Sequence, residues 1–119
     1  MADKLQPQVF GLRDSRATQR ALRFFSDRRI NVTFVDLARK PIAVAELRRF
    51  TQRFGANAMF DADSAAFRDA GLGYLSMDED QAFERLIANP KLMRLPLIRA
   101  GADLSVGLDE AAWRRWVAP

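Results

Sequence analysis

The fold is decided by residues 9–22, whose sequence is VFGLRDSRATQRAL. Apolar residues open this segment, a short polar loop follows, and Ser15 precedes residues with helical spacing, so the pattern predicts a strand, a tight loop and a helix. The start of a helix collects unpaired backbone N–H groups and the positive end of the helix dipole, and it therefore suits an anion or a thiolate. A thiol redox protein would place a cysteine at this junction. This chain has Ser15 there instead.

The composition restricts the chemistry that the chain can perform. Its 119 residues include neither cysteine nor histidine. The missing cysteine excludes disulfides, zinc–thiolate centres and thiol redox chemistry, and the missing histidine removes the commonest general base and metal ligand. We therefore expect no metal and no cofactor. With 49% hydrophobic residues, the chain has enough apolar surface for one core, so we expect a single domain over residues 1–119.

Charge is unevenly distributed along the sequence. Residues 1–53 contain 12 Lys/Arg and five Asp/Glu, whereas residues 54–119 contain seven and ten. Such a basic half indicates an acidic partner, which could be nucleic acid, an acidic protein surface or an oxyanion, although solvated helix faces are the simpler interpretation. The chain lacks an arginine-plus-aromatic motif, which argues against nucleic acid.

Membrane association is not expected. No apolar run approaches the ~20 residues that span a bilayer. Residues 1–7 also lack the apolar stretch of a secretory signal. The sequence therefore predicts a cytoplasmic protein.

Beyond the opening segment, the pattern predicts further strands and helices. The expected strands are Gln8–Gly11, Val32–Val35, Leu97–Arg99 and Leu104–Val106. The expected helices are Arg16–Asp27, Val44–Phe54, a short helix through Phe67, one opened by a Ser76–Glu79 capping box and stopped at Asn89–Pro90, and a last one capped by Asp109. The order is a βαβ unit, a helical insertion, a β-hairpin and a C-terminal helix. It predicts an α/β protein with a mixed β-sheet and a thioredoxin-like fold.

Apolar and basic residues lie on separate faces of these helices. Leu47, Phe50 and Phe54 are expected to form the buried face of their helix, and Gly55 is expected to end it. In the last helix, helical spacing places Trp113, Trp116 and Val117 together in the core. Six arginines lie outside the apolar faces and could form a basic surface: Arg16, Arg20, Arg23, Arg48, Arg49 and Arg53.

Several segments, taken in order, resemble the arsenate-reductase-like (ArsC/Spx/YffB) family of thioredoxin-fold proteins. Residues 15–19, SRATQ, lie where the family has C-x-x-S/C-R/K. Residues 63–72, DSAAFRDAGL, resemble its R-S/T-x-x-Y/F-R-x-x-G/L segment, and residues 89–98, NPKLMRLPLI, resemble its N-P-x-L-I-x-R-P-I/V-V. The resemblance covers nearly the whole chain. It implies the thioredoxin-like fold and relatives that include glutaredoxin-dependent arsenate reductases.

The chain departs from this family at the positions that carry the chemistry. In reductases of this group a cysteine attacks the oxyanion and arginines hold it. Here Ser15 stands at the cysteine position, and Gln19, Asp63 and Leu95 stand at three cationic positions. A serine needs an adjacent base and cannot form a mixed disulfide. We therefore expect a protein without reductase activity that acts by protein contact or as a regulator, as the Spx relatives that bind RNA polymerase do.

One alternative keeps a function for the start of the first long helix. Arg13, Ser15, Arg16, Arg94 and Pro96 are the candidate pocket for glutathione or an oxyanion, either bound or turned over by an arsenate-reductase-like oxidoreductase. The resemblance implies a cis peptide bond before Pro96. We assign no catalytic residue with this pocket, because the helix N-cap is the favoured interpretation of Ser15.

Overall fold

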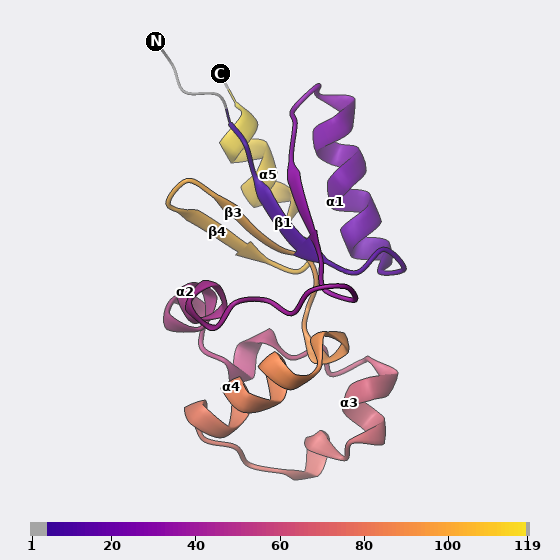
Figure 1. Ribbon diagram of the computed structural model, residues 1–119, viewed down its shortest axis with the longest axis vertical. Helices are drawn as coiled ribbons and strands as arrows, with labels where there is room; N and C mark the ends of the chain where they lie inside the picture. Colours follow the sequence, from indigo (N-terminus) through magenta and orange to yellow (C-terminus); the bar gives the residue numbers. More distant parts are fainter. Residues whose placement is uncertain (1–4, 119) are drawn as a thin grey trace. The chain divides into compact units, whose positions relative to one another are not determined.

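The computed structural model describes residues 5–118, which divide into two compact units (Figure 1). One unit combines the chain up to Lys40 with the chain from Leu95 onward, and it contains the sheet. The other is Pro41–Arg94 and is mainly helical. We call them the sheet unit and the helical unit. That residues 1–119 form a single domain stays a prediction.

The sheet unit is built on a four-stranded mixed sheet with the order β2-β1-β3-β4. Its strands are β1 (Gln8–Gly11), β2 (Thr33–Asp36), β3 (Leu97–Ala100) and β4 (Asp103–Val106). Strand β1 runs parallel to β2, with Val9 opposite Phe34, and antiparallel to β3, with Val9 opposite Ile98. Strand β4 returns antiparallel to β3. The mixed sheet and the thioredoxin-like chain order are confirmed, and each strand boundary lies within one residue of its prediction.

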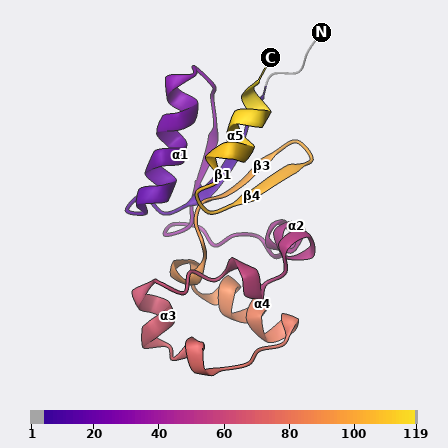
Figure 2. The same ribbon diagram turned by 180° about the vertical axis from the view of Figure 1, so that it is seen from behind.

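Two helices of the sheet unit lie side by side on one face of the sheet (Figures 1 and 2). They are α1 (Arg16–Asp27), with the predicted bounds, and α5 (Glu110–Val117), capped by Asp109 as predicted. The core that they form with the sheet consists of Val9, Ala21, Phe24, Phe25, Ile98, Ala112 and Trp113. Trp113 is fully buried, its indole Nε1 donates a hydrogen bond to Ser105 Oγ at 3.0 Å, and Trp116 and Val117 pack against the same core. This burial holds α5 beside α1.

The helical unit contains α2 (Val44–Phe54), α3 (Ala65–Asp69) and α4 (Glu79–Ala88), joined by short 3₁₀ turns. Leu47 and Phe50 are buried as predicted, and Gly55 ends α2 with a φ of +83°. The prediction that Phe54 is buried is wrong. Its side chain is 36% exposed, and the Arg53 guanidinium lies over its ring at 5.6 Å.

The start of α4 also differs from its prediction. The helix is capped by Asp78, whose carboxylate accepts the Gln81 amide at 2.8 Å while the Gln81 side chain accepts the Asp78 amide at 3.0 Å. The predicted box of Ser76 and Glu79 is therefore wrong. Glu79 instead uses both carboxylate oxygens to accept the amide of Ala56, at 2.8 and 3.1 Å. The Glu79 side chain, which the local pattern assigned to the cap, is thus bonded to a residue 23 positions away in the sequence.

Candidate functional site

Ser15 caps the N-terminus of α1, as predicted. Its backbone is extended, with φ −77° and ψ 120°, and its Oγ accepts a hydrogen bond from the Thr18 amide at 3.2 Å. The Ser15 amide donates to the Leu12 carbonyl at 3.0 Å. The side chain therefore satisfies one of the amides that a helix start leaves unpaired.

No base is bonded to Ser15 within the described part of the sheet unit. Among the described residues of the sheet unit, no carboxylate accepts a hydrogen bond from the Ser15 hydroxyl. Asp14 is exposed, and Asp36 accepts the Ala38 amide at 3.0 Å and pairs with Arg13. Because a serine nucleophile needs a base beside it, this arrangement caps a helix but does not activate a hydroxyl.

The loop before α1 is held by its own side chains. Arg13 Nε lies 3.5 Å from Asp36 Oδ2, and its guanidinium stands over the Phe34 ring at 5.0 Å, so this cation is engaged by β2. Gln19, for which the resemblance implied a cationic position, donates from Nε2 to the Arg13 carbonyl at 2.6 Å. Gln19 thus helps to fix the loop, where an arginine would present a charge.

Strand β1 and helix α1 approach each other most closely at Gly11 and Thr18. A Cβ on Gly11 would lie 2.5 Å from Thr18 Oγ1 and 2.6 Å from Thr18 Cγ2, which is too close for real atoms. Thr18 is fully buried, and its hydroxyl has no hydrogen-bond partner among residues 5–118. The approach therefore requires glycine at position 11.

Pro96 lies in the sheet unit, at the start of β3. It follows a cis peptide bond, as the resemblance implied, and it is buried. Its carbonyl accepts the Gly107 amide at 3.0 Å, which ties it to the turn after β4. Leu95, for which the resemblance implied a cationic position, is buried too, at 8% exposure.

Arg94 and Asp63 belong to the helical unit. Arg94 is exposed, and it donates from its amide to the Met59 carbonyl at 2.8 Å and from Nη1 to the Ala58 carbonyl at 3.4 Å. Asp63 is exposed, with its carbonyl accepting Arg68 Nη1 at 2.6 Å. The residues of the candidate pocket are therefore divided between the two units, and a pocket formed by all of them stays a prediction.

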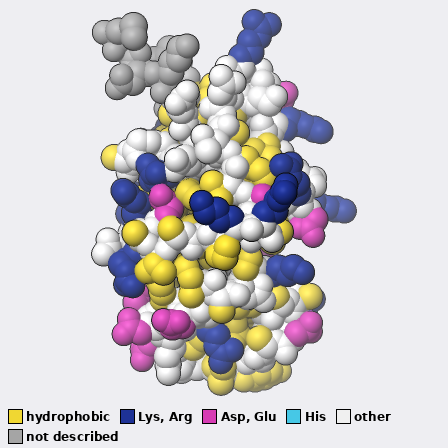
Figure 3. Space-filling model, in the orientation of Figure 1, with side chains coloured by type: hydrophobic (Ala, Val, Ile, Leu, Met, Phe, Trp, Pro, Cys, Tyr) yellow, Lys and Arg dark blue, Asp and Glu magenta, His cyan; other side chains and the backbone are white. Residues whose placement is uncertain are grey.

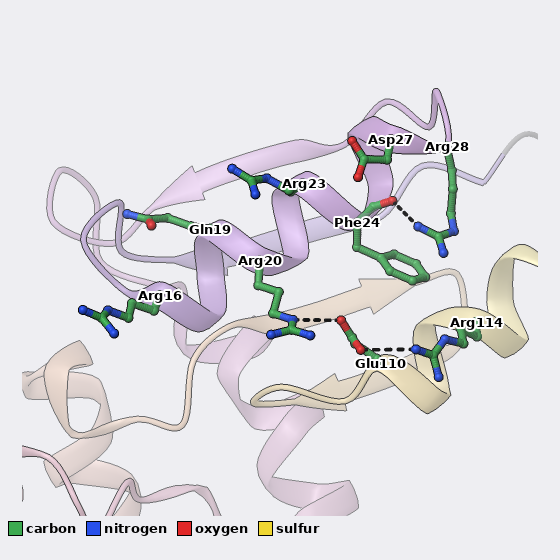
Figure 4. Close-up of a pocket in the computed structure, with 9 residues that line it drawn as sticks. All are labelled: Arg16, Gln19, Arg20, Arg23, Phe24, Asp27, Arg28, Glu110 and Arg114. Atoms are coloured by element: carbon green, nitrogen blue, oxygen red, sulfur yellow. Dashed lines mark hydrogen bonds and ion pairs between the residues drawn. The ribbon is translucent and has the colours of Figure 1, made fainter.

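A groove that the sequence patterns did not predict lies in the sheet unit between α1 and α5 (Figure 4). It has a volume of about 480 Å³. The residues that line it are Arg16, Gln19, Arg20, Arg23, Phe24, Asp27, Arg28, Glu110 and Arg114. The regular spacing of arginines along α1 could have indicated the wall that this helix forms. The other wall lies 90 residues further along the chain, where local patterns give no sign of the pairing.

Glu110 joins the two walls of this groove. Its Oε1 accepts from Arg20 Nε of α1 at 2.9 Å, and its Oε2 lies 3.3 Å from Arg114 Nη2 of α5 (Figure 4). The hydrogen bond from Arg20 is the largest cause of a lowered pKa for Glu110; partial desolvation opposes it, and the charges of Arg20 and Arg114 add to it. Glu110 thus remains a carboxylate that neutralises part of the local positive charge.

Residues 5–118 contain neither a metal-ligand cluster nor a helix that could span a membrane. No group of three or more His, Cys, Asp or Glu side chains is arranged there to hold a metal ion. No helix in this part of the chain is long and apolar enough to cross a membrane. The expectation of no cofactor stays a prediction.

A family model places the chain among known proteins. The ArsC family model matches residues 12–116. No curated protein sequence gives a significant match.

Solved structures resemble the chain over nearly its whole length. The structure of a YFFB protein has 20% identity and a TM-score of 0.85, and the likeness covers 94% of this chain and 99% of that protein. An ArsC family related protein from Bacteroides fragilis has 18% identity and a TM-score of 0.82, covering 95% and 98%. An arsenate reductase from Vibrio cholerae has 18% identity and a TM-score of 0.75, covering 88% and 92%. At these identities the likeness shows the thioredoxin-like fold.

Proposed function

Because the chain belongs to the ArsC family, we propose that it is a member without reductase chemistry, which acts by contact with a protein partner. The observation that carries this proposal is the use of Ser15 as the cap of α1, with its hydroxyl accepting from Thr18. A cysteine thiol, with a pKa near 8.5, forms a thiolate at a helix start, whereas a serine hydroxyl does not ionise there without a base. The chain has no cysteine at any other position to replace it.

The side chains around Ser15 support the same reading. Arg13 is engaged by Asp36 and Phe34, and Gln19 is bonded to the loop, so neither is held ready for an oxyanion. In the helical unit, the acidic Asp63 stands where the resemblance implies a cation. Exposed arginines on the outer face of α1 provide instead a surface for a macromolecular partner. A cytoplasmic location is part of this proposal.

A reductase assay tests the loss of chemistry. Arsenate is supplied with glutathione, glutaredoxin and glutathione reductase, and NADPH consumption is followed for the wild type, Ser15→Ala and an active arsenate reductase as positive control. We expect the wild type and Ser15→Ala to match the protein-free rate. Turnover by the wild type that Ser15→Ala loses would overturn the proposal. It would favour the alternative of an oxyanion- or glutathione-using enzyme.

Binding experiments test the contact role. Affinity capture from cell extract, at several salt concentrations, is expected to return the same specific partner with the wild type and with Ser15→Ala. Capture of no specific partner would count against the proposal. In parallel, thermal shifts with arsenate, phosphate, sulfate and glutathione are expected to be negligible. A stabilisation that disappears in Ser15→Ala would support the small-ligand alternative.

A further inference from the structure

The groove between α1 and α5 carries more positive charge than its own carboxylates neutralise. Five arginines line it, against the carboxylates of Asp27 and Glu110. Glu110 is shared by Arg20 and Arg114. Arg16 and Arg23 are exposed and have no ion-pair or hydrogen-bond partner among the described residues. Figure 3 shows dark-blue side chains along the right of the view, where α1 lies, interspersed with magenta ones.

One arginine of the groove is held by an aromatic ring. The Arg28 guanidinium lies 3.7 Å from the centre of the Phe24 ring and donates from Nη1 to the Phe24 carbonyl at 3.0 Å. Phe24 itself is only 6% exposed. The face of the Phe24 ring is therefore occupied by the Arg28 guanidinium. It is not available to stack on a nucleic-acid base, which is how proteins usually bind single strands.

We propose that this groove binds an acidic segment of the protein partner, whose carboxylates pair with Arg16 and Arg23. The inference rests on the proposed contact role and names the chemistry of the partner. Guanidinium groups match carboxylates in a planar, two-bonded geometry, and here all the cations are arginines. The lack of an open aromatic ring favours a peptide over a nucleic acid.

The length of the groove indicates how many residues of the acidic partner segment it can hold. Helix α1 has 12 residues, and lining residues run from Arg16 to Arg28. At 1.5 Å per residue this wall is about 18 Å long. An extended peptide advances about 3.3 Å per residue, so about six residues span the wall. Hexaglutamate is therefore a suitable probe.

Glu110 has a specific role in this proposal. It already occupies two arginines of the groove, Arg20 at 2.9 Å and Arg114 at 3.3 Å, as an acidic partner would. Its carboxylate is thus an internal competitor for the incoming segment. Replacing it by glutamine releases both cations and keeps the size of the side chain.

The test is fluorescence anisotropy with labelled hexaglutamate and with hexaglutamine as the neutral probe. We expect the wild type to bind hexaglutamate, with an affinity that falls as salt rises, and not to bind hexaglutamine. The variant Arg16→Glu/Arg23→Glu should bind at least about tenfold more weakly. The matched control is Arg39→Glu/Arg115→Glu, which makes the same charge change at two exposed arginines of the sheet unit outside the groove. It should lose less than about threefold.

A variant that should bind more tightly completes the test, because misfolding cannot explain a gain in affinity. Glu110→Gln should bind hexaglutamate at least about threefold more tightly than the wild type, because two arginines are released. Equal losses in the groove variant and its control, or no gain in Glu110→Gln, would overturn the inference and leave only a general charge effect. Tighter, groove-dependent binding of an oligothymidylate of the same charge would assign the groove to nucleic acid instead. Groove-dependent self-association would assign it to a second copy of the chain.

The failure of this inference is separable from failure of the proposed function. If Arg16→Glu/Arg23→Glu captures the same protein from extract as the wild type does, the groove is not the contact surface, while the contact role stands. If turnover of arsenate depends on Ser15, the proposed function fails whatever the groove binds.

Discussion

The start of helix α1 and its outer face differ in whether their polar side chains have partners within the chain. At the start, two polar side chains are bonded close by: Ser15 accepts from Thr18, three residues away, and Gln19 donates to Arg13, six residues away. On the outer face, arginines from α1 and α5 meet, and two of them, Arg16 and Arg23, have no partner among the described residues. The side chains of Ser15 and Gln19 are thus bonded within the chain, whereas the outer face has positive charge that no described carboxylate pairs with.

This difference means that, within one helix, the start contributes mainly to stability and the outer face mainly to binding. Local hydrogen bonds and close packing at the start contribute to the free energy of unfolding, so changes there should weaken the fold. Exposed arginines add little to stability, because solvent screens them, but they set electrostatic attraction to a partner. Variants of the two regions should accordingly fail in different assays.

The largest effect on stability is expected from Gly11→Ala. The new Cβ would meet Thr18 Oγ1 at 2.5 Å, so strand and helix must move apart. We expect a loss of about 2 kcal/mol in the free energy of unfolding, measured by urea denaturation. Gly73→Ala is the matched control, because its Cβ would make an ordinary contact of 3.7 Å with Phe67; it should change stability by less than about 0.5 kcal/mol.

A second variant identifies the cause of that loss. Thr18→Ala removes the two atoms that would collide with the new Cβ. The double variant Gly11→Ala/Thr18→Ala should therefore be more stable than the sum of the single changes predicts. Strict additivity would mean that the chain conformation at Gly11, and not the collision, sets the cost.

A smaller effect is expected when the cap of α1 is removed. Ser15→Ala leaves the Thr18 amide without its acceptor and should cost about 1 kcal/mol by the same measurement. Ser15→Asp should keep most of the stability, because a carboxylate both accepts this amide and suits the positive end of the helix dipole. An unchanged stability in Ser15→Ala would mean that the hydroxyl is not committed to the cap, and the contrast between the two regions would weaken.

The same contrast explains which features could be predicted from sequence. The bounds of α1 and α2, the cap at Ser15 and the mixed sheet follow from local spacing and capping chemistry, and the structure confirms them. The predicted capping box of α4 was wrong because Ala56, distant in sequence, takes the Glu79 carboxylate.

The groove was missed for a related reason. Its arginines on α1 were visible in the sequence, but the opposite wall is set by the packing of Trp113 in the core, which brings Glu110 within reach of Arg20. A charged surface built from two distant segments leaves no local pattern. Its net charge depends on which ion pairs form, and these depend on the tertiary structure.

The smallest expected effect concerns the one carboxylate that joins the two walls of the groove. The hydrogen bond from Arg20 lowers the pKa of Glu110 below its ordinary value, with a lesser contribution from the charge of Arg114. A carboxyl with a lowered folded pKa contributes stability that is present above the unfolded pKa and is lost as pH falls through the folded one. We therefore expect this contribution to be constant near neutral pH and to disappear only in acid.

Carboxyl NMR titration of Glu110 in two variants tests how it is held. Arg20→Gln should raise the pKa of Glu110 toward the ordinary glutamate value, and Arg114→Gln should raise it less, because Arg20 supplies both the hydrogen bond and the larger charge effect. A larger shift in Arg114→Gln would mean that Glu110 is paired within α5. Arg20 would then belong with Arg16 and Arg23 among the cations open to a partner. In that case the Glu110→Gln variant would release one arginine and not two, and its gain in peptide affinity should shrink accordingly.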